Sequence, residues 1–176
     1  MRLLLETTEL VRAAIPDTMP LLVRIPGSDW VPESFHGFDV SQAVPLGLAL
    51  ADLGVDFIDV CSAGLLSEQK VISGPGYQAP FAAAVKKALQ EAGKNEKTVV
   101  GTVGMITSGL QAQELLNDGM ADAILVARAF QKSPALVWEW ASELGVVVRV
   151  ANQIGWGFGQ HPGGGVGAGH AKAARG

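Results

Sequence analysis

Two kinds of hydrophobic pattern alternate along the chain. In some segments apolar residues recur three or four positions apart and the pattern ends near Pro or Gly, which is typical of amphipathic helices. Between them lie short, largely apolar runs rich in Val, Ile and Leu, which are typical of strands buried on both faces of a sheet. These patterns predict helices at about 2–14, 41–53, 80–92, 108–119 and 134–144, and strands at about 21–25, 55–60, 97–104 and 121–127.

The predicted elements follow one another as a helix and a strand, four times over, with one more helix at the end. Strict alternation of helices and apolar strands indicates an α/β fold with a parallel sheet. A weak internal repeat supports this order. The segments "LGVDFIDV" and "DGMADAILV" each contain a glycine at a helix end, a short turn and an apolar strand.

The chain changes character near its end. Residues 155–176 contain 9 of the 22 glycines, and such a segment cannot offset its ordering entropy by burial. We therefore predict one folded unit at 1–154 and a mostly flexible Gly-rich tail at 155–176.

Composition excludes several classes of protein. With 48% hydrophobic and 17% charged residues the chain is not intrinsically disordered. The net charge is −4 and the sequence contains no cluster of basic residues, which argues against a nucleic-acid partner. No apolar run approaches the ~20 residues of a membrane span, and Glu6 and Glu9 interrupt the pattern of a signal peptide. The single cysteine, Cys61, fits a reducing compartment, so we expect a cytoplasmic protein.

Two arginines stand in otherwise apolar strand patterns. Arg24 lies in "PLLVRIP" and Arg128 in "ILVARAF". A buried unpaired guanidinium is costly, so each arginine needs an exposed strand end, a carboxylate partner or an anionic ligand. Strand parity places both near carboxyl ends of strands, where parallel α/β folds bind ligands.

Gly104 follows one predicted strand and precedes a capped helix, in "GTVGMITSG". Glycine lets a ligand approach the backbone, and the start of a helix offers N–H groups to an anion. Gly104, the helix-start amides and Arg128 together suggest a phosphate site at the last two strands. The alternative is that Arg24 and Arg128 are solvated strand-end residues and that Gly104 serves a turn.

The other candidate residues do not suggest catalysis. His36, His161 and His170 lie in loops or in the Gly-rich tail and lack the spacing of metal ligands. Cys61 has no basic partner nearby in sequence and fits a small buried residue better than a nucleophile. No acid–base pair or triad is evident. The residues therefore predict a binding site, with no catalytic residue and no metal site.

Several separate segments carry a specific resemblance. "LLVRIPGSDW", "LGVDFIDVCSAG", "GPGYQAPFA", "VGMITSGLQAQELLNDGMADAILVARAFQKSP" and "QIGWGFG" occur in this order over about residues 1–160. This chain resembles the old yellow enzyme family of FMN-dependent NAD(P)H oxidoreductases, in the branch of bacterial NADPH dehydrogenases and their fungal relatives. The resemblance implies the second half of a TIM barrel of eight strands, with about four βα units.

The resemblance also implies roles for four residues. Arg24 would contact the pyrimidine edge of the flavin, and Gly104, Ala127 and Arg128 would hold the FMN phosphate. Ala127 stands where the family usually has glycine. In the complete enzyme, NADPH or NADH would supply a hydride that passes through FMN to an electron-poor alkene.

The segments that the resemblance covers lack part of the family's machinery. The substrate-anchoring His pair and the proton-donating Tyr of the family belong to its N-terminal half. We therefore expect little or no reductase activity from this chain alone, and expect it to form a homo-oligomer or to bind its missing N-terminal half. Two alternatives remain: a non-catalytic fragment or assembly partner with weak or no FMN binding, and an unrelated phosphate-binding α/β enzyme of flavodoxin-like topology.

Overall fold

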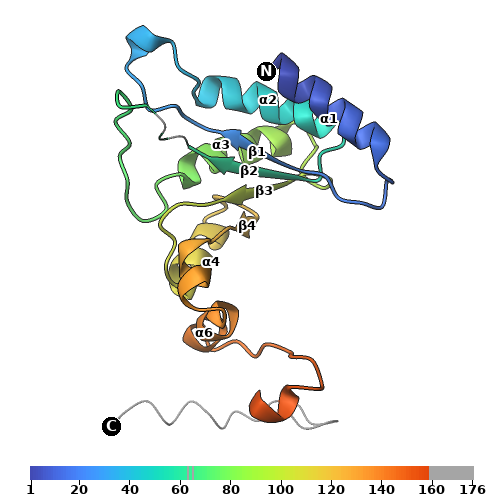
Figure 1. The fold of residues 1–176 in the computed structure, drawn as a ribbon, viewed down its shortest axis with the longest axis vertical. Helices are drawn as coiled ribbons and strands as arrows, with labels where there is room; N and C mark the ends of the chain where they lie inside the picture. Colours follow the sequence, from blue (N-terminus) through green and yellow to red (C-terminus); the bar gives the residue numbers. More distant parts are fainter. Residues whose placement is uncertain (63, 65, 159–176) are drawn as a thin grey trace.

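The computed structural model describes residues 1–62, 64 and 66–158 and contains a four-stranded parallel sheet (Figure 1). The strands lie side by side in the order of the sequence, and each neighbouring pair is parallel. The predicted α/β class with a parallel sheet is therefore confirmed. The strands are β1 (Leu22–Pro26), β2 (Phe57–Cys61), β3 (Val99–Thr102) and β4 (Ala123–Ile124).

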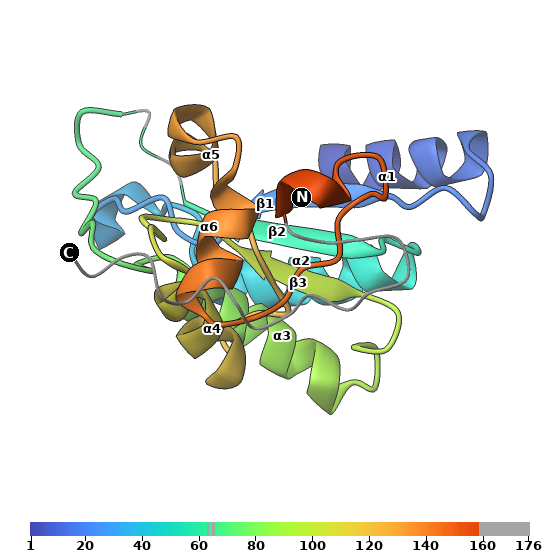
Figure 2. The same ribbon diagram turned by 90° about the horizontal axis from the view of Figure 1, so that it is seen from below.

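Four helices alternate with these strands, and two more follow β4. Figure 2 shows α3 and α4 on one side of the sheet and α5 on the other. The long helices agree with the predicted ones within a few residues, and none of the described helices is long and apolar enough to cross a bilayer. The helices are α1 (Arg2–Ala14), α2 (Val40–Asp52), α3 (Ala79–Glu91), α4 (Gly109–Asn117), α5 (Arg128–Lys132) and α6 (Leu136–Glu143).

Two short 3₁₀ helices complete the described chain, η1 (Glu33–Phe35) and η2 (Gly155–Phe158). The second one includes the first residues of the predicted flexible tail. The rest of that predicted tail, 159–176, lies outside the described residues.

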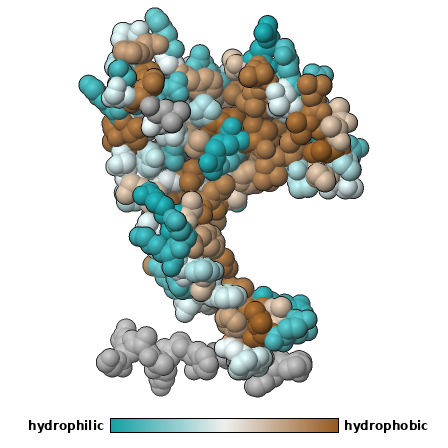
Figure 3. All heavy atoms as spheres, in the orientation of Figure 1, coloured by the Kyte–Doolittle hydropathy of each residue, from teal (hydrophilic) through white to brown (hydrophobic). Residues whose placement is uncertain are grey.

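One face of the sheet forms the core. Ile25, Ile58 and Val100 point into it from three neighbouring strands, and Leu50 and Val85 meet them from α2 and α3; all five are fully buried. The opposite face is open. Leu22 and Val99 are 60% and 37% exposed, and Figure 3 shows a broad hydrophobic area over the sheet in the orientation of Figure 1.

An aspartate ties the start of β1 to the neighbouring strand and to a helix. Asp56, which directly precedes β2, accepts a hydrogen bond from the backbone N–H of Leu21 at 2.7 Å. The same carboxylate lies 3.5 Å from the guanidinium of Arg12 on α1. The contact fixes where β1 begins relative to β2.

The second half of the sheet repeats this arrangement. Asp122, which directly precedes β4, accepts a hydrogen bond from the backbone N–H of Val100 at 2.9 Å. Its other oxygen lies 2.8 Å from the ammonium of Lys86 on α3. The weak sequence repeat thus corresponds to a repeated contact. In each half of the sheet, an aspartate before the second strand binds a backbone N–H of the neighbouring strand segment and a cation of a helix.

The prediction for the fourth strand was wrong in its length. β4 contains only residues 123–124, and the chain bends at Ala127 before α5 begins at Arg128. An apolar run does not mark its own end, and "ARAFQK" consists mostly of good helix formers. Arg128 is consequently the first residue of a helix that was not predicted, and it is not the last residue of a strand.

One prediction concerns the repeated aspartate. We expect Asp122→Ala to lower the free energy of unfolding by about 2 kcal/mol. Val100 N–H loses its acceptor, and the largely buried ammonium of Lys86 loses its carboxylate partner and keeps only the Ala121 carbonyl at 3.1 Å. Glu91→Ala is the matched control, since Glu91 forms an exposed pair with Lys87 at 3.8 Å and such pairs contribute little. Urea unfolding measures both variants. Equal losses in the two would contradict the role assigned to Asp122.

Candidate functional site

A cavity of about 470 Å³ lies where β3 and β4 end. Three separate segments of the chain line it, namely the start of α3, the residues after β3 and the residues from the end of β4 into α5. It contains Gly104, Ala127 and Arg128, three of the four residues predicted to bind a cofactor, whereas Arg24 is not among its lining residues. The lining consists of Tyr77, Gln78, Val103–Thr107, Leu125–Ala129 and Lys132.

The buried amide of Gln78 connects the ends of two strands beside this cavity. Its side-chain oxygen accepts a hydrogen bond from the Ser62 hydroxyl at 2.6 Å, and its side-chain nitrogen donates to the Val103 carbonyl at 2.9 Å. Ser62 follows β2 and Val103 follows β3. Sequence reasoning missed Gln78 because its partners lie 16 and 25 residues away and no local pattern connects them.

The backbone at Gly104 requires glycine for two independent reasons. Its φ of +123° lies in a region that side chains disfavour. A Cβ atom there would also lie 2.7 Å from Nε2 of Gln78 and 2.9 Å from the Tyr77 ring. The carbonyl oxygen of Gly104 accepts a hydrogen bond from Gly76 N–H at 3.0 Å. The next residue, Met105, also has a positive φ, +50°, so this turn of the cavity wall is held in a strained conformation.

The start of α4 does not offer its amides to a ligand in the way the sequence suggested. Ser108 caps this helix, because its hydroxyl accepts a hydrogen bond from Gln111 N–H at 3.1 Å. However, Gly109 N–H donates to the Glu143 carboxylate of α6 at 2.6 Å. An internal carboxylate thus occupies the anion position at this helix terminus, and this part of the predicted phosphate site was wrong.

The charged residues of the cavity are both cations. Arg128 and Lys132 line it, and its lining contains no Asp or Glu. In the described part of the chain, no carboxylate lies within ion-pair distance of either residue. They are four positions apart on α5, a spacing that puts two side chains on the same helix face. The cavity is thus electrostatically suited to an anion.

Arg24 has a different environment on the open face of the sheet. Its Nε donates to Oδ2 of Asp59 at 2.5 Å, and Asp59 is its direct partner in the β1–β2 register. This hydrogen bond and the charge of Asp59 raise the pKa of Arg24 above its usual value. The guanidinium side chain is 61% exposed. Two of the explanations left open by the sequence, an exposed position and a carboxylate partner, therefore both apply.

Asp59 is the buried member of this pair. Its side chain is only 8% exposed, and its second oxygen, Oδ1, has no hydrogen-bond partner among the described residues. The neighbouring Cys61 is half-buried, and this burial raises the pKa of its thiol. The Cys61 thiol points to the Ile25 carbonyl at 3.6 Å. A protonated, partly buried thiol fits the structural role expected for Cys61.

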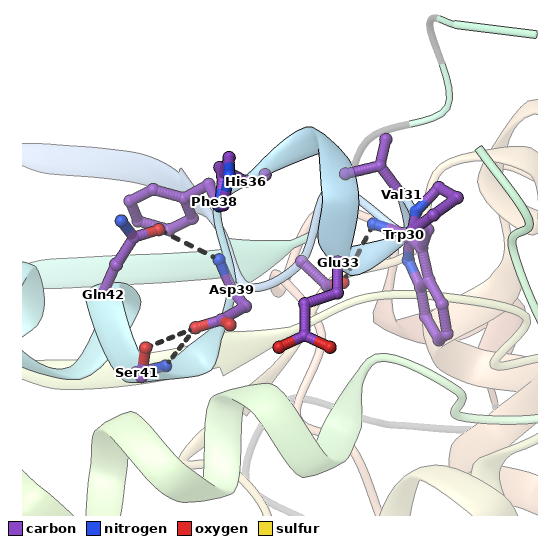
Figure 4. Close-up of a pocket in the computed structure, with 11 residues that line it drawn as sticks. Trp30, Val31, Glu33, His36, Phe38, Asp39, Ser41 and Gln42 are labelled. Carbon is purple, nitrogen blue, oxygen red and sulfur yellow. Dashed lines mark hydrogen bonds between the residues drawn. The ribbon is translucent and has the colours of Figure 1, made fainter. Parts of the chain in front are cut away.

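A second cavity, of about 480 Å³, lies between the loop after β1 and the start of α2 (Figure 4). Its acidic residues are Glu33 and Asp39, and the latter caps α2 by accepting from Ser41 N–H at 2.8 Å. The hydrogen bonds from Ser41 lower the pKa of Asp39. The formally charged side chains of this cavity are negative, and Asp39 already caps α2. This cavity is therefore less suited to an anion than the one beside Gly104.

Comparison with known proteins gives a consistent set of relatives. The chain is 38% identical over 169 residues to an NADH:flavin oxidoreductase of Gibberella zeae. It is 40% identical over 141 residues to an NADPH dehydrogenase of a Geobacillus species and 32% identical over 139 residues to that of Bacillus subtilis. No protein-family model matches the chain.

The matches cover most of this chain but a minor part of each relative. They extend over 89%, 79% and 78% of the chain and over 39%, 38% and 38% of the three relatives in the same order. The chain thus spans about two fifths of the length of the curated relatives it matches.

One prediction tests the glycine of the cavity wall. We expect Gly104→Ala to lower the free energy of unfolding by about 3 kcal/mol, because positive-φ strain adds to the clash with Gln78 and Tyr77. Gly119→Ala is the matched control, with a φ of +71° and no atom within 4 Å of the added Cβ. This control should lose only about 1 kcal/mol. Equal losses in chemical denaturation would show that Gln78 and Tyr77 do not constrain Gly104.

Proposed function

Since the chain is homologous to part of the NADH:flavin oxidoreductases and NADPH dehydrogenases of the old yellow enzyme family, we propose that it forms the FMN-binding portion of such an oxidoreductase. In this proposal Gly104, Ala127 and Arg128 surround the phosphate of FMN. The observation that carries it is their convergence: residues from two distant segments line one cavity whose charged side chains are both cations.

The cavity residues fit a phosphate by their chemistry. A guanidinium such as that of Arg128 can bind phosphate through two parallel charge-assisted hydrogen bonds. Gly104 lines the cavity without a side chain, so a ligand can approach its backbone. A Cβ atom at this position would collide with Gln78 and Tyr77. The backbone N–H of Ala127 is proposed to bind the phosphate as well, although a methyl group replaces the hydrogen of the family's usual glycine.

Arg24 is proposed to face the pyrimidine edge of the flavin. Its hydrogen bond with Asp59 uses only Nε, which leaves the two amino groups of the guanidinium to bind a ligand. A guanidinium stays charged in proteins, so Arg24 can stabilise negative charge on a reduced ring. The chemistry supplied by bound FMN is hydride transfer from NADPH or NADH to an electron-poor alkene.

The sheet is proposed to be half of an eight-stranded (β/α)₈ barrel. Its four parallel strands leave β1 and β4 without an outer neighbour in the described part of the chain. The face opposite the core exposes Leu22 and Val99. Open edges and an apolar face favour association, which the remaining part of such an enzyme or a second copy of the chain would satisfy.

A non-catalytic role in flavin binding or assembly is the second candidate. The resemblance assigns the family's His pair and proton-donating Tyr to the half that this chain does not match, and the cavity lining contains no His, Asp or Glu. We therefore propose that the chain alone binds and orients the cofactor without reducing an alkene.

One prediction tests the cofactor. FMN should bind the purified chain with quenching of its fluorescence, and Arg128→Ala should weaken binding about tenfold, the usual value of a charge-assisted hydrogen bond. Lys87→Ala is the control, because it removes a cation from the outer surface of α3. The absence of FMN binding, or equal binding by the wild type and Arg128→Ala, would contradict the proposal.

A further inference from the structure

We propose that Lys132 is a second phosphate-binding cation and that the cavity therefore selects a phosphate monoester in its doubly negative form. The inference rests on the proposed function only in placing a ligand in the same cavity. Sequence reasoning had singled out Arg128 and had not considered Lys132.

The position of Lys132 follows from the helix that replaced the predicted end of β4. α5 contains residues 128–132, so Arg128 is its first residue and Lys132 its last. Both line the cavity, as does Ala129. Positions four apart meet on one helix face, so one bound anion can contact both long side chains.

The charge balance around α5 points to an anion. Two like charges four positions apart destabilise a helix by a few tenths of a kcal/mol, and neither cation has a carboxylate within ion-pair distance in the described ranges. Lys86 is a useful contrast, since its ammonium lies 2.8 Å from Asp122. A bound anion would supply the negative charge that Arg128 and Lys132 lack.

The number of cations indicates which phosphate is preferred. A phosphate monoester carries a charge of about −1.5 to −2 at pH 7, because its second pKa is about 6. A phosphodiester carries only one negative charge per phosphorus. Two cations in one cavity therefore match a monoester best, and the match weakens when acid converts the dianion to the monoanion.

The remaining cavity wall suits a phosphate attached to an apolar body. Ile106, Leu125 and Val126 line the cavity together with Met105. Free phosphate uses only the cationic end, whereas a phosphorylated aromatic compound can also use this apolar wall. The two sources of the same phosphate group can be distinguished by measuring them separately.

The test compares Lys132→Gln with Lys97→Gln, a control that removes the same charge from an exposed loop residue. FMN, riboflavin and inorganic phosphate are titrated separately at pH 7.5 and pH 5.5, with fluorescence for the flavins and amide NMR shifts for phosphate. We expect Lys132→Gln to weaken FMN and phosphate binding about tenfold at pH 7.5, leave riboflavin unaffected, and reduce the loss of affinity at pH 5.5. Lys132→Arg should retain binding.

Each outcome decides one of the two claims. If FMN binds and Lys132→Gln behaves like Lys97→Gln, the role of Lys132 is overturned while the proposed function stands. If FMN does not bind but phosphate binds in a Lys132-dependent manner, the flavin assignment fails and the phosphate site stands. If neither ligand binds, or if riboflavin and FMN both weaken equally in Lys132→Gln, the phosphate site is overturned.

Discussion

The hydrogen bonds of the buried Gln78 amide hold together the part of the molecule on which the candidate site depends. They join Ser62, beyond β2, to Val103, beyond β3, from the first turn region of α3. Gly104 follows directly and packs so closely against Gln78 that a Cβ cannot be accommodated. A satisfied buried amide specifies one arrangement, because an alternative would leave its polar atoms unpaired. The cavity wall is thus positioned by contacts between segments that are distant in sequence.

The amino and carboxyl ends of the strands contribute differently to the structure. At the amino ends of the strands, Asp56 and Asp122 each accept a hydrogen bond from a backbone N–H group and pair with a cation of α1 or α3. At the carboxyl ends lie the strained Met105 and the cations of α5. Parallel α/β proteins commonly place stability at one end and ligand binding at the other. The two aspartates fix the strand register at the amino ends. The carboxyl ends can therefore carry Gly104 and cations without a carboxylate partner.

Local pattern predicted the long helices and the four strands, but not the short helix α5 and not the distant side-chain partners. The long helices and their alternation with strands follow from hydrophobic periodicity and from Gly and Pro stops, which act over short distances. Pairs such as Arg24–Asp59 and Gly109–Glu143 join residues 35 and 34 positions apart, and nothing in the local sequence marks them. The extra helix α5 was missed because "ILVA" continues an apolar run past the last strand residue. The cavity residues were found through strand ends and glycine, and Gln78 and Lys132 were not.

The central claim is that the cavity between Gly104 and α5 binds the phosphate of a flavin nucleotide. Amide NMR of the ¹⁵N-labelled chain, titrated with FMN and with riboflavin in parallel, tests it most directly. The account predicts that the amide signals of Gly104, Ala127 and Arg128 shift with FMN and move much less with riboflavin, which lacks the phosphate. Shifts confined to the loop between β1 and α2, or identical shifts with both compounds, would contradict it.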